Sequence, residues 1–484
     1  MSDVPGRSPS AARIAGDYYQ HLVAWNESLE ALRAHDDLTA VTVEHPDAGN
    51  VDDIVTQRRI GPSLYTQVKH AVDATTPVGQ RWLMTPRTSG LASSSVLQKF
   101  HGSWQHLTTH DRPPELRLIT DREIDPNDPV MSRLDRGTEL LVPAISHHRG
   151  TEGRALWAEH LDISEDELVE FLGSLRFETG RTIRSQEQRA STLMSAMGLN
   201  SDGRAIDAAV GLMRDWVQRR DRTLTPEGLR DWAQQRVGQR TQPGAVVVIE
   251  TIDRDPHPGD ADERINFVDS YLGDEAFQRR QLRDPSQWTH IVAEIEQAAQ
   301  RLRDAGTRRV VVRGAMRLPV WFAAGAAFRD VRGFETAGLQ KDAIWSSEDL
   351  DTPAAVQVDT VRIGDGPDVA VAVGIAADPS SQVSDYVMAA SLPIGSLVSI
   401  LPDGGPSPAS VLDSRIAAAT AVAARDAVRA VLQVESADRI HLFLATPGAL
   451  ALLLGHRWNA MRPTTVYEHL GTGNGYAPTF LISA

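Results

Sequence analysis

The stretch "RVVVRGAMRLPVWFAAG" (309–325) carries the pattern that decides the fold of the C-terminal half of this chain. Its run of valines is typical of a strand that is buried on both faces of a parallel sheet. A short connection containing Arg313, Gly314 and Arg317 follows, and an alanine-rich helical stretch comes next. This order predicts a strand–loop–helix unit of an α/β fold.

The same pattern recurs at an offset of 130 residues, as "RIHLFLATPGALALLLG" (439–455). The two stretches align without a gap, with arginine and glycine at matching ends, and a long alanine-rich helical stretch precedes each one. We therefore predict a duplicated α/β unit, with halves at about 241–365 and 366–484. A ligand cleft is expected where the carboxyl ends of the strands meet the amino ends of the helices.

The sequence before the duplicated unit has a pattern typical of helices. In "ISEDELVEFLGSLRF" (163–177), apolar residues recur at helical spacing, and Ser164 and Asp166 are candidate caps. The "TPE" in "LTPEGLRDWAQQRV" predicts another helix start, and "GQRTQPG" (238–244) is a candidate linker. We predict three regions: a first domain at 1–150, a helical region at 151–240 and a sensor-like domain at 241–484.

Composition fits a multidomain globular protein. The chain has 484 residues, of which 41% are hydrophobic and 23% charged, too many for one ordinary core. No apolar run approaches the ~20 residues of a membrane span, and the absence of cysteine excludes disulfides and thiolate zinc sites. We expect a cytoplasmic protein with no membrane partner. The net charge of −15 predicts weak, salt-sensitive binding of the resting protein to nucleic acid.

The first 150 residues predict a mixed sheet framed by helices. Alternating or β-branched runs mark the strands, and a turn at "RIGP" joins the second strand to the third as a hairpin. The expected elements are a helix at 13–35, strands at 40–44, 53–57 and 64–70, a helix at 96–107 and a strand at 115–121.

Two of these strands carry polar residues that a purely structural strand does not need. Asp53 precedes the aliphatic start of the second strand, and Gln67 and Lys69 share one face of the third. Asp53 is a hard oxygen ligand suited to Mg²⁺, Gln67 offers an amide oxygen, and Lys69 is placed to orient the attacking water or stabilise a phosphorane. Asp52 is the rival to Asp53. The alternative without a functional role is that Asp53 is an acidic residue of a turn, and that Gln67 and Lys69 lie on the solvent-exposed face of an edge strand.

On this frame, Asp53…Gln67-Val68-Lys69 resembles the PD-(D/E)XK nuclease fold in its Asp…Gln-x-Lys form. The preceding helix carries "GDYYQ" (16–20), which is similar to the Gly-x-x-Phe-Glu motif of restriction endonucleases, with Gln20 at the acidic position. The resemblance implies a Mg²⁺- or Mn²⁺-dependent nuclease. The implied metal ligands are Asp53 and Gln67, and Glu44 is the candidate for the missing carboxylate.

The stretch "HLFLATPGALALLLGHRWNAMRPTTVYEHLGTGNGYAPTFLI" (441–482) resembles the SAVED domain, which consists of two halves related to the CARF fold. That resemblance covers about 243–484 and implies a pocket for a cyclic di- or trinucleotide. Helix starts bind phosphates, arginines pair with them, and aromatic rings either stack on bases or belong to the core. The candidate ligand residues are Arg313, Gly314, Arg317, Trp345, Thr446, Pro447, Gly448, Trp458 and Tyr467.

The combination of a PD-(D/E)XK-like domain with a SAVED-like domain in one chain resembles the nuclease effectors of CBASS anti-phage immunity. They imply a double-stranded DNA substrate, self-association on ligand binding, and coupling to a cGAS-like nucleotidyltransferase that makes the ligand. One alternative is a sensor or scaffold with a degenerate nuclease domain, because Gln20 and Gln67 replace carboxylates. Another is a restriction-like nuclease whose C-terminal half senses a different nucleotide.

Overall fold

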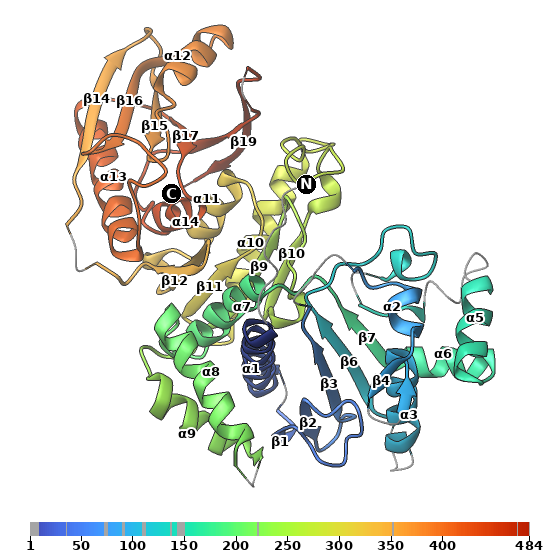
Figure 1. Ribbon diagram of the computed structural model, residues 1–484. Coiled ribbons are helices and arrows are strands. Elements are labelled where there is room, and N and C mark those ends of the chain that lie inside the picture. The colour runs from blue at the N-terminus through green and yellow to red at the C-terminus, as the bar shows by residue number, and fades with distance from the viewer. Residues whose placement is uncertain are drawn as a thin grey trace. The chain divides into compact units, whose positions relative to one another are not determined.

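The computed structural model describes residues 9–34, 36–71, 76–89, 92–108, 113–135, 138–142, 151–219, 222–350, 353–471 and 473–483. The chain is a mixed α/β protein that divides into two compact units (Figure 1). The first unit comprises Met1–Ala190 and Gly203–Gln239, and the second comprises Ser191–Asp202 and Arg240–Ala484. The division falls inside helix α7, so the interval predicted as a helical region contributes residues to each unit.

The first unit contains a six-stranded mixed sheet in the order β7-β6-β3-β2-β1-β8. β3 and β6 are parallel, as are β6 and β7, whereas β1, β2 and β3 alternate in direction. The strands are β1 (Leu38–Val43), β2 (Ile54–Arg58), β3 (Leu64–Lys69), β6 (Glu115–Thr120), β7 (Leu175–Glu178) and β8 (Thr223–Leu224), with a separate pair β4 (Arg87–Ser89) and β5 (Ala92–Ser94).

The helices of the first unit include the two that the sequence predicts before and after the hairpin. They are α1 (Pro9–Ala34), α2 (Gln80–Met84), α3 (Val96–Thr108), α5 (Thr151–Leu161), α6 (Glu165–Gly173), α7 (Ile183–Ala196, shared with the second unit), α8 (Gly203–Val217) and α9 (Pro226–Val237). The predicted helix, three strands, helix and strand occur in that order, but α2, β4 and β5, which were not predicted, lie between β3 and α3. Ser164 caps α6 by accepting the Glu167 N–H, and Thr225 caps α9 in the same way.

Four short strands of the first unit were not predicted, namely β4, β5, β7 and β8, and β7 was taken for part of a helix. The stretch that continues the α6 pattern, Leu175–Glu178, forms β7 at the edge of the sheet, parallel to β6. Ser174 ends the helix, after which Leu175 and Phe177 point into the same buried layer. Four residues are too few for the alternation of a strand to stand out from the helical pattern before it.

Helices cover both faces of this sheet. Leu116 and Leu118 of β6 pack with Phe100 and Trp104 of α3 in one apolar cluster. Arg117 lies between them in sequence, points to the opposite face and pairs with Glu27 of α1. The apolar face of α1 is buried, including Leu22, Val23, Trp25, Leu29 and Leu32.

The second unit contains two sheets of the predicted duplicated kind. Their orders are β10-β9-β11-β12-β13 and β14-β16-β15-β17-β18-β19, so β9-β11-β12-β13 corresponds to β15-β17-β18-β19. The corresponding inner strands are parallel, and β13 and β19 are each antiparallel to their neighbours. The strands are β9 (Ala245–Glu250), β10 (Glu263–Asn266), β11 (Arg309–Arg313), β12 (Glu335–Gln340), β13 (Ala343–Ser346), β14 (Val356–Arg362), β15 (Asp368–Gly374), β16 (Ile394–Pro402), β17 (Ile440–Ala445), β18 (Thr464–His469) and β19 (Tyr476–Ile482).

The helices of the two halves correspond as well. They are α10 (Gln287–Asp304) and α11 (Leu318–Ala327) in the first half, and α12 (Ser380–Ala389), α13 (Ser414–Val434) and α14 (Gly448–His456) in the second. α11 and α14 are buried over their whole length and pack on each other. A methyl group at Gly325 would overlap the carbonyl oxygen of Leu452, and one at Gly455 would overlap that of Phe322. Phe322 and Leu452, like Gly325 and Gly455, are separated by the same 130-residue offset as the sequence repeat, which supports the duplication.

Part of the predicted linker is held in place. The Arg240 N–H donates to the carbonyl of Gly198, and the Gly244 N–H donates to that of Ala196, at the end of α7. Ala196 joins a small apolar cluster on the five-stranded sheet. None of the helices in the described ranges has both the length and the apolar character that a bilayer crossing requires.

Candidate functional site

The structure brings three of the predicted nuclease residues together. Asp53 lies directly before β2, and the pairing of Ile54 with Thr66 sets it beside Gln67 on β3. Its Oδ1 accepts a hydrogen bond of 3.0 Å from Gln20 Nε2 of α1. Its Oδ2 accepts from the Gln67 side-chain amide and, at 2.6 Å, from the backbone N–H of Val68. The carboxylate is therefore fixed by three hydrogen bonds from two elements, α1 and β3.

Burial dominates the electrostatics of Asp53. Loss of water raises the pKa of this carboxyl to about 6, although the Val68 N–H and the positive charge of Lys69 act in the opposite direction. Lys69 follows Gln67 on the same face of β3, so its ammonium acts on the same carboxylate. A cation next to this buried carboxyl group would stabilise its ionised form.

Glu44 and Asp52 are near Asp53 through the backbone. The Glu44 N–H donates to the Asp53 carbonyl at 3.0 Å, and the His45 N–H donates to that of Asp52 at 2.8 Å. The Glu44 carboxylate, however, forms a 2.8 Å ion pair with Arg222, and Glu44 adopts a left-handed φ of 47°. The contacts of Glu44 thus differ from the predicted ligand set, and its role at a metal stays a prediction.

Sequence reasoning missed a second polar pair at the same edge of the sheet. His70 follows β3 and Asp121 follows the parallel strand β6, and His70 Nδ1 lies 2.7 Å from Asp121 Oδ2. The ring of Tyr19, next to Gln20 on α1, lies 5.1 Å from that of His70. The signal was available, because the carboxyl ends of parallel neighbours meet at one edge. Within the described ranges, nonetheless, His, Asp and Glu never gather in groups of three or more that suit a metal ion.

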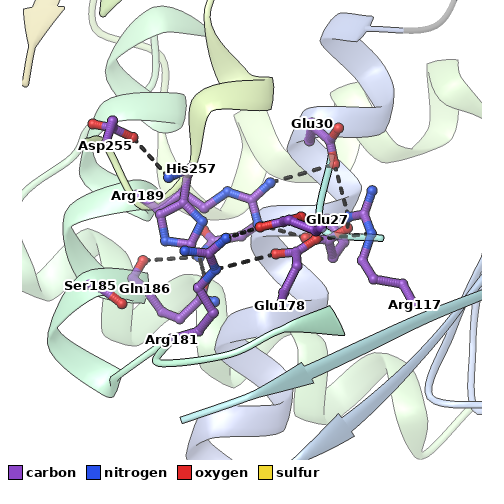
Figure 2. A network of polar contacts seen from close by, with 12 residues as sticks. Glu27, Glu30, Arg117, Glu178, Arg181, Ser185, Gln186, Arg189, Asp255 and His257 are labelled. Atoms are coloured by element: carbon purple, nitrogen blue, oxygen red, sulfur yellow. Dashed lines mark hydrogen bonds and ion pairs between the residues drawn. The ribbon is translucent and has the colours of Figure 1, made fainter. Parts of the chain in front are cut away.

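A buried ion network on the other face of the sheet fixes α1 in place (Figure 2). Glu27 of α1 pairs with Arg117 of β6 and, at 2.5 Å, with Arg189 of α7, and Arg117 also reaches Glu178 of β7 at 3.0 Å. Burial raises the pKa of Glu27 to about 7, against the pull of the two arginines. This network holds α1, the helix that carries Gln20, against β6 and β7, and β6 is the neighbour of the strand that carries Gln67.

The second unit contains a cavity of about 380 Å³ to which both halves of the duplication contribute. It lies beyond the carboxyl ends of β11, β17 and β18, where a cleft was expected. Its lining comprises Ile252, Arg280, Met316, Arg317, Leu318, Ala377, Asp378, Pro379, Gln382, Leu444, Ala445, Glu468, His469 and Tyr476.

Arg317 and Glu468 are the buried charged pair of this cavity. Arg317 Nε donates to the Arg279 carbonyl at 2.6 Å and lies 3.9 Å from Glu468 Oε1. Burial raises the pKa of Glu468 to about 8, with Arg317 and Arg280 opposing the rise. Among the described atoms, Glu468 Oε2 is buried without a hydrogen-bond partner. The cavity therefore keeps an unsatisfied polar atom that a ligand can satisfy.

The contacts of Arg313 in the structure differ from those predicted for a phosphate ligand, and its role in ligand binding stays a prediction. Its guanidinium is buried and pairs with Asp255 at 3.0 Å and Asp260 at 3.2 Å, and it donates to the His257 carbonyl at 2.5 Å. Its charge is therefore already compensated. Gly314 is required for another reason, because a side chain there would overlap the Ile249 carbonyl oxygen.

The predicted aromatic contacts lie in the core. Trp458 is buried, donates to Thr464 Oγ1 at 2.9 Å and meets the Phe322 ring edge-on. Tyr467 is buried as well, and its hydroxyl lies 2.7 Å from His441 Nδ1. The geometry thus favours packing over base stacking for both residues.

The remaining predicted residues do not line the cavity. Trp345 is buried and lines a different hollow, beside Asp349 and Ser414. Thr446, Pro447 and Gly448 form the start of α14, directly after the lining residues Leu444 and Ala445. Of the nine candidate ligand residues named above, Arg317 lies in the lining. Glu468 and Arg280 were missed, because a glutamate near the end of "TTVYEH" looks like an ordinary strand-end residue.

Comparison with known proteins identifies the class of the second unit. Residues 291–482 match the family described as "SMODS-associated and fused to various effectors sensor domain", or SAVED. This part of the chain is a SAVED domain, as the C-terminal motifs predict.

Over most of its length the chain is similar to CD-NTase-associated protein 4 from Enterobacter hormaechei subsp. hoffmannii (strain UCI 50). The two are 24% identical over 521 residues, covering 96% of this chain and 98% of that protein. Similar solved structures include the Acinetobacter baumannii Cap4 SAVED/CARF-domain containing receptor with the cyclic trinucleotide 2′3′3′-cAAA (TM-score 0.44, 14% identity, 97% of this chain and 99% of that chain). Another is the Moraxella osloensis Cap4 receptor (TM-score 0.40, 12% identity, 98% and 100%).

Proposed function

We propose that the chain is a metal-dependent endonuclease for double-stranded DNA, that a cyclic oligonucleotide bound to its SAVED domain activates it, and that it acts in CBASS anti-phage defence. The observation that carries the nuclease half is the convergence of Gln20 and Gln67 on the buried Asp53 carboxylate, with Lys69 acting on it electrostatically. This convergence is what a PD-(D/E)XK core requires. The SAVED match supports the sensor half, and the name of the relative supports coupling to a nucleotidyltransferase.

Mg²⁺ or Mn²⁺ is the cofactor that this donor set fits. The Asp53 carboxylate supplies a hard oxygen, and a half-turn of the Gln67 amide exchanges its nitrogen for its oxygen at the same place. Release of Glu44 from Arg222 would add a second carboxylate. When bound, the cation supplies compensation for the charge on the phosphodiester.

Lys69 is the residue of the chain that acts directly on the substrate. Its ammonium donates hydrogen bonds to the attacking water and to the phosphate oxygens, so it orients the first and stabilises the charge that grows on the second. Water adds at phosphorus, one bridging P–O bond breaks, and the leaving oxygen takes a proton. Val68 and Gln20 fix the position of Asp53 during this step through their hydrogen bonds.

For the ligand, we propose the cavity at Arg317 and Glu468. Arg317 and Arg280 supply positive charge for the phosphates of a cyclic oligonucleotide. Glu468 offers its unpartnered Oε2 to a polar group of the ligand. Occupation of the cavity favours self-association only if the assembled state binds ligand more tightly than the resting one does.

One observation favours the second candidate, a sensor with a degenerate nuclease domain. The cluster contains one carboxylate, because Gln20 and Gln67 stand at positions where acids are usual and Glu44 pairs with Arg222. Such a protein binds the cyclic nucleotide and assembles but hydrolyses nothing.

Substitution of Lys69 by alanine separates the two candidates. In the proposed enzyme, Lys69→Ala abolishes plasmid cleavage with Mg²⁺ and leaves cyclic-nucleotide binding, measured by calorimetry, unchanged. Arg230→Glu on the exposed surface of α9 serves as a control that keeps both properties. Ligand binding in a wild-type protein that cleaves under no member of a panel of cyclic di- and trinucleotides would establish the degenerate sensor instead.

A further inference from the structure

The first unit contains a cleft whose lining includes none of the nuclease-cluster residues. Its volume is about 690 Å³. The loop after β1, the β2–β3 hairpin and the end of α3 form its walls. The lining residues are His45, Asp47, Gln57, Arg58, Arg59, Gly61, Ser63, Tyr65, His106, Leu107 and Pro114.

This cleft opens on the same face of the sheet as the nuclease cluster. Tyr65, Gln67 and Lys69 alternate along β3 and therefore point to one side. The pairing of Val55 with Tyr65 places Asp53 on that side as well, in agreement with its bond to Gln67. Tyr65 lies two residues, or about 7 Å, from Gln67 along the strand. The cleft therefore lies along the same face of β3 as the cluster, and Tyr65 is its lining residue nearest to Gln67 on that strand.

The lining is basic in a chain whose net charge is −15. Arg58 and Arg59 face the cleft with two histidines, against the single carboxylate of Asp47. Arg58 is fixed by a 2.7 Å bond from Nε to the Pro62 carbonyl and a 3.4 Å ion pair with Glu115. Gly61 leaves room for this arrangement, because a methyl group there would lie 3.0 Å from the Arg58 guanidinium carbon.

Two further features fit contact with a duplex. Arg59 and His106 are exposed residues of the cleft lining. Ile60 lies between the lining residues Arg59 and Gly61 at the hairpin tip, and its side chain is 76% exposed. An isolated apolar side chain on a basic hairpin is suited to contact with sugars or base edges.

We propose that this cleft binds the sugar–phosphate backbone of duplex DNA beside the scissile phosphate, with Arg59 and His106 as phosphate contacts and Tyr65 between them and the cluster. The inference rests on the proposed endonuclease function and specifies where its substrate lies. The charges explain how an acidic protein holds a polyanion: the contact is local, and it is sensitive to salt.

The test is DNA binding by the full-length Lys69→Ala protein, which binds without cleaving, to a fluorescein-labelled duplex at several salt concentrations. Arg59→Glu is added to this background, and Arg230→Glu, an equal charge change on exposed α9, is the matched control. We expect Arg59→Glu to weaken binding about tenfold or more and to lower the slope of log K against log salt by about one or more, whereas Arg230→Glu changes neither. His106→Glu is a second variant at an exposed position and should act in the same direction.

Equal affinities and slopes for the Arg59→Glu, His106→Glu and Arg230→Glu proteins would overturn the cleft assignment. That failure is distinct from failure of the proposed function. If wild-type protein cleaves plasmid and Arg59→Glu cleaves it equally well at every salt concentration, the nuclease stands and the cleft does not bind DNA. Absence of cleavage by the wild type under every cyclic nucleotide would remove the nuclease itself.

Discussion

At the scale of single residues, two buried charged groups of the SAVED domain have different roles despite similar burial. Arg313 has two carboxylate partners, so its charge is compensated inside the protein. Glu468 has one distant cationic partner, an unsatisfied oxygen and a place in a cavity wall. Removal of the Arg313 side chain should therefore lower the stability of the protein. Replacement of Glu468 by a neutral residue should raise it.

Arg313→Ala leaves Asp255 and Asp260 buried without their cation. We expect the free energy of unfolding to fall by about 3–5 kcal/mol, measured by urea denaturation of the full chain. A variant that kept wild-type stability but lost cyclic-nucleotide binding would contradict this structural role and restore the direct phosphate contact.

Glu468→Gln should stabilise the protein at neutral and alkaline pH. The folded-state pKa is raised to about 8 from an ordinary value of 4.5, so between these values the unfolded chain releases the proton that the folded chain keeps. Stability of the wild type therefore falls as pH rises from about 4.5 to 8. The variant should lose this part of the slope and gain about 1–3 kcal/mol at pH 8.

Urea unfolding at pH 5 and pH 8 measures the effect. Glu294→Gln, at an exposed position of α10, is the control and should follow the wild type at both pH values. A Glu468→Gln protein with the same pH dependence as the wild type would mean that Glu468 is ionised and well compensated in the folded state.

At the scale of elements, the α11–α14 crossing holds the two SAVED halves together. Gly325→Ala puts a methyl group onto the Leu452 carbonyl, and the helices must move apart. We expect a loss of about 1–3 kcal/mol, although alanine is normally the better helix former. Gly211→Ala in α8 meets only the end of Arg214 at 4.0 Å and should gain about 0.5–1 kcal/mol.

Chemical denaturation of the two alanine variants makes the comparison. Stabilisation by Gly325→Ala equal to that by Gly211→Ala would mean that α11 and α14 are not in close contact. Because the two substitutions are identical in chemistry, a difference in sign isolates the helix crossing.

The same elements explain what sequence could predict. The longer strands and helices of the first unit and the duplicated unit followed from periodicity, since each pattern extends over a whole element, whereas short strands such as β7 did not. The Asp53 cluster was predictable because neighbouring strands bring 53 and 67 together. The partners of Arg313 were not, because Asp255 and Asp260 come from an irregular segment with no pattern that marks its path. For the same reason the pairing of Glu44 with Arg222, 178 residues apart, was not foreseen.

At the scale of the whole molecule, the charge of −15 opposes DNA binding by a single protomer. In the proposed mechanism, ligand-driven self-association would place several weak sites along one duplex and raise avidity without new contacts. We expect the activating cyclic nucleotide to increase the sedimentation coefficient and DNA affinity together, and Arg317→Ala to reduce both responses. Stronger DNA binding by a species that sediments unchanged would contradict activation through assembly.

The most direct test of the central claim is plasmid cleavage with Mg²⁺ by the wild-type chain, with each member of a panel of cyclic di- and trinucleotides and without any. The account predicts cleavage that appears with a particular cyclic nucleotide, is absent without it, and is lost in Lys69→Ala. Equal cleavage with and without every cyclic nucleotide would contradict control by the SAVED domain, and cleavage retained in Lys69→Ala would contradict the catalytic cluster.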